Sequence, residues 1–388
     1  MPSERPLRIA LAAGEASGDA LGGGLMAALR ERAPGSRYFG IAGPTMSAAG
    51  CETWHHTEEL SVMGFAEVLR HLPRLLELRR GLIRRLIDAA PDVFIGIDSP
   101  DFNLPVARAL RRTGIATVQY VSPQVWAWRQ SRVVSIREAV DLVLCLLPFE
   151  AAFYERHGVK ATFVGHPLAD EIPLEVDRGA ARAALGLAAD GPLLAVLPGS
   201  RRTEVARLAR PFMETARWLR GRHADLGVVV ALASDTTHTE FVERTRGIEL
   251  EPRAQVVVRK ARQALAAADV VLTASGTATL EATLLKRPMV VAYIISGLTH
   301  GLYRLLGLRK LPYFSLPNLL AGRELFPEYL QREVRAETLG PALELQLARS
   351  ADRSGWYDAV TAIHGELRRG ASEAAAAAVL ALLDRKAR

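Results

Sequence analysis

Asp98 is the first side chain whose position suggests chemistry. It follows the apolar run Val93–Ile97 directly and precedes the turn signal Ser99-Pro100. Such a run, β-branched and aromatic around one glycine, predicts a buried parallel strand. Ligands of open α/β sheets bind just beyond the carboxyl ends of the strands, so Asp98 lies where chemistry is usually done. The alternative is that Asp98 caps the next helix or closes the turn.

A glycine-rich turn follows the first apolar run of the chain, at residues 13–25. Glycines allow the backbone to approach a ligand closely at a helix N-terminus. The spacing is not Gly-x-Gly-x-x-Gly and has no Walker Lys-Ser/Thr, so it favours neither a dinucleotide site nor a P-loop. Glu15 and Asp19 would repel a pyrophosphate and would suit hydrogen bonds to hydroxyl groups. An ordinary turn with an aspartate near a helix start explains the pattern equally well.

Two further turns in the second half follow the runs Leu193–Leu197 and Val270–Thr273. The first turn, residues 198–204, offers backbone N–H groups with Arg201 or Arg202 for a phosphate. The second, residues 274–281, brings small and hydroxyl side chains to a helix start, and Glu281 could accept hydrogen bonds from a ribose diol. Two such turns in one domain favour an anionic nucleotide over two ordinary turns.

Aromatic and basic stretches have two interpretations each. Three aromatic side chains and a cation within residues 120–129 could wall an acyl or sugar pocket, but packing under a loop is the commoner use of tryptophan. The segment Leu69–Ile87 combines apolar residues with six arginines and one acid, Glu77. A basic amphipathic helix can lie in an anionic membrane surface. It can also pack on a sheet with a solvated arginine face, and Pro73 and Gly81 interrupt its pattern.

No catalytic triad or metal cluster emerges from the sequence. The nine histidines are scattered apart from His55-His56, and none has the spacing of metal ligands. Asp98 and Asp101 do not form an Asp-x-Asp pair. The two cysteines lie far apart in the sequence, which excludes a disulfide framework and fits a reducing cytosol.

The elements that must position these residues are short buried strands alternating with amphipathic helices, a pattern typical of doubly wound parallel sheets. The strand runs fall into two sets, which predicts an α/β protein with two Rossmann-like domains. The seam is expected between Gly165 and Leu193, and helices return near Ala336–Leu347 and Ser372–Leu383. The predicted strands are Leu7–Ala12, Tyr38–Ala42, Val93–Ile97, Ile115–Val121, Leu142–Leu147, Ala161–Val164, Leu193–Leu197, Gly227–Leu232, Gln255–Val258, Asp269–Thr273 and Met289–Tyr293.

Length and composition agree with two domains. The chain has 388 residues, too many for one ordinary core, with 49% hydrophobic and 23% charged residues. A net charge of +7 suits an anionic partner such as a nucleotide, a phosphorylated substrate, nucleic acid or a membrane surface. We interpret residues 1–13 as leading into a first strand and not as a signal peptide. No apolar run approaches the ~20 residues that a membrane-spanning helix needs.

Taken together, the motifs resemble the lipid-A-disaccharide synthase family. The resemblance runs in the same order from about Leu7 to Gln331, and as a set the motifs are highly specific. They are Gly14–Asp19, Gly96–Asn103, Tyr120–Arg129, Leu197–Arg201, Ala274–Glu281 and Ser315–Arg323.

The resemblance implies an inverting, metal-independent glycosyltransferase that needs no cofactor. It also implies the B-type fold, in which the parallel sheets of the two domains face a central cleft. Such an enzyme joins UDP-2,3-diacylglucosamine to 2,3-diacylglucosamine 1-phosphate through a β-1,6 bond and releases UDP. It also implies a protein bound peripherally to the cytoplasmic face of the inner membrane, without a nucleic-acid partner, and a homodimer that exchanges C-terminal segments. The alternatives are another UDP-sugar enzyme of the same fold, either a 2-epimerase or a soluble-acceptor transferase, or a non-catalytic nucleotide- or lipid-binding protein.

The resemblance itself implies roles for Asp98, Arg201 and Asn318, and the wider B-type fold implies the ribose role of Glu281. The other expected site residues come from the turns and the basic segment described above. Residues 1–170 are expected to form the acceptor domain, 171–335 the UDP-sugar domain, and 336–388 helices that pack back on the first domain or are exchanged. Asp98 is the expected general base. The expected donor residues are Arg201, Ser200, Gly199, Ser275, Gly276, Thr277, Glu281 and Asn318. The expected acceptor or cleft residues are Glu15, Ser17, Asp19, Asp101, Asn103, Trp126 and Arg129, and the expected membrane residues are Leu69, Leu72, Leu75, Leu76, Arg79 and Arg80.

Overall fold

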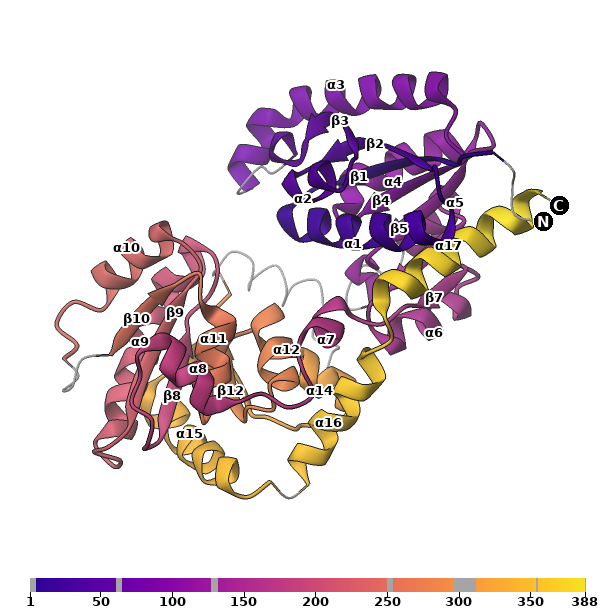
Figure 1. Ribbon diagram of the computed structural model, residues 1–388. Coiled ribbons are helices and arrows are strands. Elements are labelled where there is room, and N and C mark those ends of the chain that lie inside the picture. The colour runs from indigo at the N-terminus through magenta and orange to yellow at the C-terminus, as the bar shows by residue number, and fades with distance from the viewer. Residues whose placement is uncertain are drawn as a thin grey trace. The chain divides into compact units, whose positions relative to one another are not determined.

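The computed structural model describes residues 5–60, 65–126, 132–249, 254–295, 312–353 and 355–387, with the backbone alone for residues 65–72. The chain divides into two compact units (Figure 1). Unit 1 consists of residues 1–170 and 367–388, and unit 2 of residues 171–366. The chain therefore passes between the units at Asp170/Glu171 and again at Glu366/Leu367.

Unit 1 is built on a parallel sheet in the order β3-β2-β1-β4-β5-β6-β7. The strands are β1 (Arg8–Ala13), β2 (Arg37–Ala42), β3 (Glu52–His56), β4 (Val93–Ile97), β5 (Ala116–Tyr120), β6 (Leu142–Cys145) and β7 (Ala161–Phe163).

Helices cover both faces of this sheet. Along β1, Ile9 and Leu11 pack in one core, whereas Ala10 and Ala12 pack in the other, as the period of two in a strand requires. The first core contains α1 (Ala16–Arg32), α2 (Pro44–Ala48) and α17 (Ala371–Ala387). The second contains α3 (Phe65–Ala89), α4 (Pro100–Arg111), α5 (Val133–Ala139) and α6 (Pro148–Arg156). Alternate side chains of one buried strand thus hold two helix layers.

Unit 2 is built on a second parallel sheet in the order β10-β9-β8-β11-β12-β13. The strands are β8 (Leu193–Leu197), β9 (Gly227–Leu232), β10 (Gln255–Val258), β11 (Val270–Ala274), β12 (Met289–Tyr293) and β13 (Glu328–Leu330). The helices of the second half are α7 (Pro167–Glu171), α8 (Arg178–Leu185), α9 (Arg202–Arg220), α10 (Asp235–Arg244), α11 (Ala261–Ala267), α12 (Thr277–Leu284), α14 (Leu316–Ala321), α15 (Ala336–Ala351) and α16 (Trp356–Leu367). Helices α9, α10 and α15 share one core with the sheet, and α11 and α12 contact the same strands.

The predicted fold class, two α/β domains with parallel sheets, is confirmed. The sequence did not predict β3, β13 or α16. Both strands are edge strands, and their partly exposed residues include Glu52, His56 and Glu328, so neither forms an apolar run.

The C-terminal segment is shared between the two units. Helices α15 and α16 belong to unit 2, whereas α17 lies beside α1 in unit 1 (Figure 1). The side chains of Ala375, Ala376 and Val379 are buried in the core that α1 also lines. The last helix therefore completes the fold of unit 1.

Candidate active site

Asp98 follows the last residue of β4, and its backbone is held in an unusual conformation. Asp98 and Ser99 have φ angles of 54° and 39°, a left-handed region that side chains other than glycine rarely adopt. The Asp98 carbonyl accepts hydrogen bonds from Asn103 Nδ2 at 2.9 Å and Gln119 Nε2 at 3.0 Å. Both amide side chains are fully buried, so they can hold this turn against its conformational cost.

The Asp98 carboxylate itself is half-buried. It makes no hydrogen bond or ion pair with any other residue that the structure describes. A carboxylate at a strand end that the fold does not use is available to a ligand.

Two glycines bring the residues around Asp98 together. A Cβ at Gly96 would lie 2.7 Å from Asn103 Cβ, so only glycine leaves room for the buried amide. A Cβ at Gly14 would lie 1.8 Å from Ser99 Oγ. The turn that carries exposed Glu15 and Ser17 therefore contacts the turn that carries Asp98.

Asp19, Asp101 and Asn103 have other partners. The Asp19 carboxylate is 2% exposed and accepts backbone N–H groups of Gly43 at 2.8 Å, Thr45 at 2.7 Å and Met46 at 3.0 Å. The Asp101 carboxylate is exposed and pairs with Arg132. Asp19 and Asn103 therefore hold the turns around them, whereas the Asp101 carboxylate lies at the surface, and an acceptor contact stays a prediction for all three residues.

Trp126 packs against the first turn of α6, and its role in an acyl or sugar pocket stays a prediction. Its Nε1 donates to Glu150 Oε1 at 3.1 Å, and its ring meets the ring of Phe149 edge-on at 4.8 Å. Burial raises the pKa of Glu150 to about 7. Arg129, the other residue expected from this stretch, lies outside the described residues.

The turn before α9 is already capped by the helix itself. Glu204 Oε2 accepts the backbone N–H of Ser200 at 3.0 Å and of Arg201 at 3.2 Å. Gly199, with φ of 125°, packs against the same side chain. A phosphate here would meet a carboxylate at those N–H groups, which leaves side-chain donors such as Arg201. The Arg201 side chain is 75% exposed, and its Nη1 lies 3.5 Å from Glu204 Oε1.

The turn before α12 is open. Gly276 has φ of 146°, and a Cβ there would have no neighbour within 4 Å. Gly276 and Thr277 are exposed, Ser275 is half-buried, and the first turn of α12 carries no acidic residue. A helix N-terminus of this kind attracts anions through its free N–H groups and its dipole. Since β8 and β11 are neighbouring parallel strands, the turns that carry Arg201 and Gly276 both lie at the carboxyl ends of the strands.

Glu281 and Asn318 differ in how much of each side chain the fold uses. The Glu281 side chain is 17% exposed, and burial raises the pKa of its carboxyl while the Arg262 charge lowers it. The Asn318 amide donates to Phe326 O and Glu328 Oε1, both at 2.8 Å, and its Oδ1 accepts two backbone N–H groups. Asn318 therefore shapes the segment around α14, whereas the Glu281 side chain stays partly exposed.

Sequence reasoning missed Gln119 and Glu204. Gln119 is a polar residue inside the buried strand β5, and that conflict between residue type and burial was a usable signal. Glu204 is the third residue of α9, a position at which glutamate commonly caps a helix.

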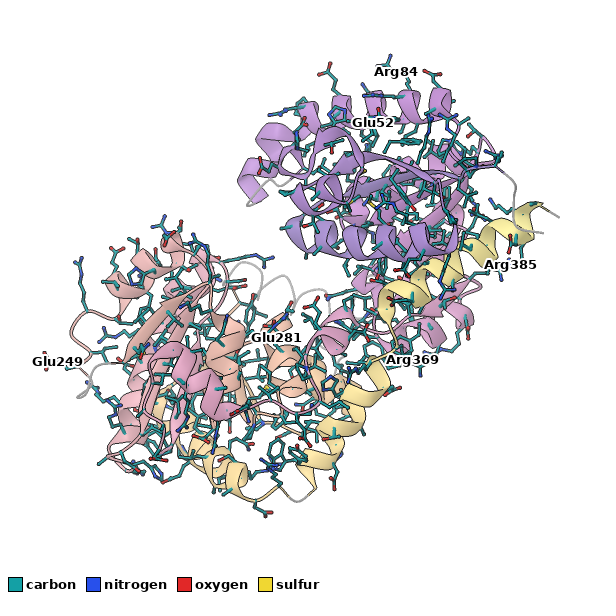
Figure 2. The ribbon with its side chains drawn as sticks, in the orientation of Figure 1. Glu52, Arg84, Glu249, Glu281, Arg369 and Arg385 are labelled. Carbon is teal, nitrogen blue, oxygen red and sulfur yellow. The ribbon has the colours of Figure 1, made fainter. Side chains whose placement is uncertain are left out.

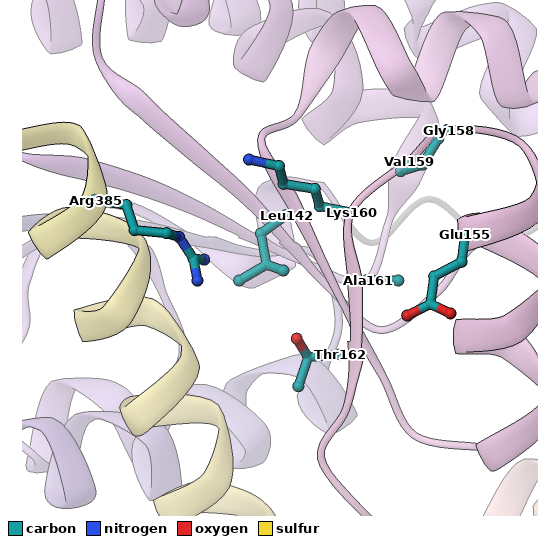
Figure 3. A pocket seen from close by; sticks show the side chains of 8 residues that line it. All are labelled: Leu142, Glu155, Gly158, Val159, Lys160, Ala161, Thr162 and Arg385. Atoms are coloured by element: carbon teal, nitrogen blue, oxygen red, sulfur yellow. The ribbon is translucent and has the colours of Figure 1, made fainter.

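A cavity of about 500 Å³ lies elsewhere in unit 1 (Figure 3). It is lined by Leu142 and Ala161, the first residues of β6 and β7, with Lys160 and Arg385 at its rim. The cavity thus lies at the amino ends of the parallel strands, whereas Asp98 lies at their carboxyl ends. It contains none of the predicted site residues.

Helix α3 has a core-facing part and an exposed part. Leu82 and Leu86 are each 1% exposed and pack on the sheet. Leu75, Leu76 and Arg79 are half-exposed, Arg80 is exposed, and Arg84 points away from the sheet (Figure 2). The side chains of Leu69 and Leu72 lie outside the described residues. Over the part of the chain that the structure describes, no helix has the length and apolar character to cross a bilayer.

The comparisons with known proteins identify the family. A family model described as lipid-A-disaccharide synthetase matches residues 9–382. The chain belongs to the lipid-A-disaccharide synthase family. The enzyme of that name from Pseudomonas aeruginosa is 53% identical over 381 residues, 98% of this chain and 99% of the relative. The one from Xanthomonas oryzae pv. oryzae is 51% identical over 382 residues, 98% of this chain and 88% of the relative.

Solved structures agree on the fold. A UDP-GlcNAc 2-epimerase from Neisseria meningitidis, solved with UDP-GlcNAc, superposes with a TM-score of 0.65 at 11% identity, covering 97% of this chain and 100% of its own. A calicheamicin glycosyltransferase gives 0.58 at 18%, with 99% and 100% covered. Such low identity shows the architecture alone. Family membership decides the activity: the chain is a glycosyltransferase of lipid A biosynthesis, not an epimerase or a non-catalytic binding protein.

Proposed function

We propose that this enzyme joins UDP-2,3-diacylglucosamine to 2,3-diacylglucosamine 1-phosphate, with inversion at the anomeric carbon and without a metal ion. The products are the β-1,6-linked disaccharide 1-phosphate and UDP.

Asp98 is the proposed general base. A sugar hydroxyl is a poor nucleophile until a carboxylate takes its proton during the attack. The acceptor 6-hydroxyl gives its proton to Asp98 as its oxygen forms a bond to the anomeric carbon, and the bond to the UDP oxygen breaks on the opposite face. One displacement of this kind inverts the anomeric configuration.

The departing UDP takes the electron pair of the broken bond, so negative charge grows on its diphosphate. The open N-terminus of α12, around Ser275, Gly276 and Thr277, and the exposed Arg201 side chain are the proposed donors to that charge. Each preorganised donor of this kind can lower the barrier by roughly 2.7–4 kcal/mol. Glu281, one turn into α12, is the proposed acceptor for the ribose hydroxyls.

The observation that carries the proposal is the Asp98 turn, where two buried amides hold the backbone and leave the carboxylate to a ligand. The test combines both acylated sugars with a chelator and measures UDP release and the configuration of the new bond. Asp98→Asn should reduce transfer by about 10²–10⁴-fold while UDP still binds. Near-normal turnover of this variant would remove Asp98 as the base, and a product with retained configuration would exclude a single displacement.

The half-exposed part of α3 is the proposed membrane contact, on the cytoplasmic face of the inner membrane. Replacing Leu75 and Leu76 by Ser should release the protein from vesicles that contain anionic lipid. Ile87→Ser is the matched control, because Ile87 is an exposed apolar residue on the part of α3 that packs on the sheet. Retention of the Leu75/Leu76 variant on the vesicles would make α3 a structural helix. A homodimer, like the C-terminal exchange, stays a prediction.

A further inference from the structure

Three charged side chains form a chain of ion pairs from Glu281 through Arg262 to Glu171, the residue at which the chain enters unit 2. Arg262 Nε lies 3.4 Å from Glu281 Oε1, and Arg262 Nη1 lies 3.1 Å from Glu171 Oε2. Arg262 is the second residue of α11, which packs against α12, where Glu281 lies (Figure 2). Glu171 is the first residue of unit 2. One guanidinium therefore serves two carboxylates, of which only Glu281 is at the candidate nucleotide site.

The three groups differ in exposure. The Glu281 side chain is 17% exposed, against 43% for Arg262 and 55% for Glu171. Glu281 is thus the carboxylate that loses most hydration, and it depends most on a nearby cation to stay ionised. Among the described residues the charges that act on it are those of Arg262 and Glu171, and these have opposite effects on its pKa.

We propose that Arg262 positions the Glu281 carboxylate to accept hydrogen bonds from the ribose diol of the donor nucleotide, and that Glu171 competes with Glu281 for Arg262. The proposal rests on the ribose role of Glu281 given above. An ionised carboxylate accepts from both hydroxyls of a diol, whereas a protonated one must use one oxygen as a donor. Arg262 does not need to touch the nucleotide, so it is a positioning residue.

The proposal predicts that substitutions of Arg262 and Glu171 change the affinity for UDP in opposite directions. Arg262→Met should weaken UDP binding by about three- to fivefold, the range expected for a partly exposed ion pair. Glu171→Gln should strengthen UDP binding by about twofold, because Arg262 is then shared with no other carboxylate. A structural role for this cluster would give losses in both variants.

Calorimetric titration with UDP and with 2′-deoxy-UDP separates positioning from general damage. In the unmodified protein the ribose nucleotide should bind more tightly than the deoxy one, and in Arg262→Met this ratio should shrink. The pH dependence should also shift, since loss of the Arg262 charge raises the pKa of Glu281 and affinity for UDP then falls at a higher pH on acidification. Arg262→Lys should restore part of the ratio. Arg210→Met, which breaks an exposed pair with Glu214 on α9, is the matched control and should leave both affinities unchanged.

Two results would overturn the proposal, and they differ. If Glu281→Gln leaves UDP affinity unchanged, the ribose role of Glu281 is wrong and the inference falls with it. If Glu281→Gln weakens UDP binding about tenfold while Arg262→Met leaves the UDP to 2′-deoxy-UDP ratio unchanged, the ribose role stands and Arg262 does not position Glu281. Melting curves of each variant identify any that are unfolded.

Discussion

Gly14→Ala should disable the enzyme through Asp98, although Gly14 carries no functional group. The added Cβ would lie 1.8 Å from Ser99 Oγ and 2.4 Å from Ser99 Cβ. Rotation about χ1 can move the hydroxyl but not the Cβ, and carbon atoms in contact need about 3.5–4.0 Å. One of the two turns must therefore move by about 1 Å.

A movement of that size next to Asp98, the proposed base, should have a large kinetic cost. Displacement of a reacting group by about 1 Å can lower the rate by about 10²-fold, or about 2.7 kcal/mol in activation free energy. The assay is UDP release at saturating substrate, with UDP affinity measured separately. Because the clash is in unit 1, kcat should fall about 10²-fold while UDP affinity in unit 2 stays unchanged.

A second substitution tests whether the clash is the cause. Ser99 has φ of 39°, which glycine adopts without strain, and Ser99→Gly removes both clashing atoms. The double variant Gly14→Ala/Ser99→Gly should regain most of the lost kcat. Gly81→Ala is the control, because a Cβ at Gly81 in α3 would have no neighbour within 4 Å. Normal kcat in Gly14→Ala, or no recovery in the double variant, would refute the reasoning.

Three further predictions concern buried polar groups. Gln119→Leu removes one of the two donors to the Asp98 carbonyl and should lower kcat about tenfold with KM for the donor unchanged, which steady-state kinetics will check. Arg182→Met leaves Asp269 buried with Arg178 as its one remaining ion-pair partner among the described residues, and should destabilise unit 2 by about 3 kcal/mol in calorimetry. Burial raises the pKa of Glu150 from 4.5 to about 7, so the folded state binds a proton that the unfolded state has lost. Stability relative to Glu150→Gln should therefore fall as pH rises from about 4.5 to about 7, by at most about 3 kcal/mol. If the difference in denaturation midpoint between the unmodified protein and Glu150→Gln does not change with pH over that range, the prediction for Glu150 is wrong.

The fold class could be predicted because its signals are local. A strand such as Val93–Ile97 is buried on both faces, so its apolar run is visible in the sequence. Charged and polar residues interrupt the strands β3 and β13, so both lack this signal and were missed, whereas the edge strands β7 and β10 kept an apolar run and were predicted. The order of the strands depends on which runs pair, and Ile9 pairs with both Tyr38 and Val93 over very different sequence separations.

The candidate site could be predicted only as a set of turns. The sequence placed Asp98, the turn before α9 and the turn before α12 at strand ends, since strand ends follow directly from the strands. The sequence could not show which polar side chains form hydrogen bonds within the fold and which stay available to a ligand. Asp19 and Asn318 have the same residue types as a ligand contact, but each is surrounded by partners that arrive from elsewhere in the chain.

The sequence by itself therefore determined two parallel α/β domains, the family, and the turns at which ligands can bind. Burial and hydrogen bonding decided the rest, because both depend on contacts between distant segments. Tertiary structure left the Asp98 carboxylate without a partner among the described residues, closed the α9 turn with Glu204 and left the α12 turn open. It also joined Arg262 to both Glu171 and Glu281, residues 91 and 19 positions away in the sequence. No local pattern encodes such a pair of contacts.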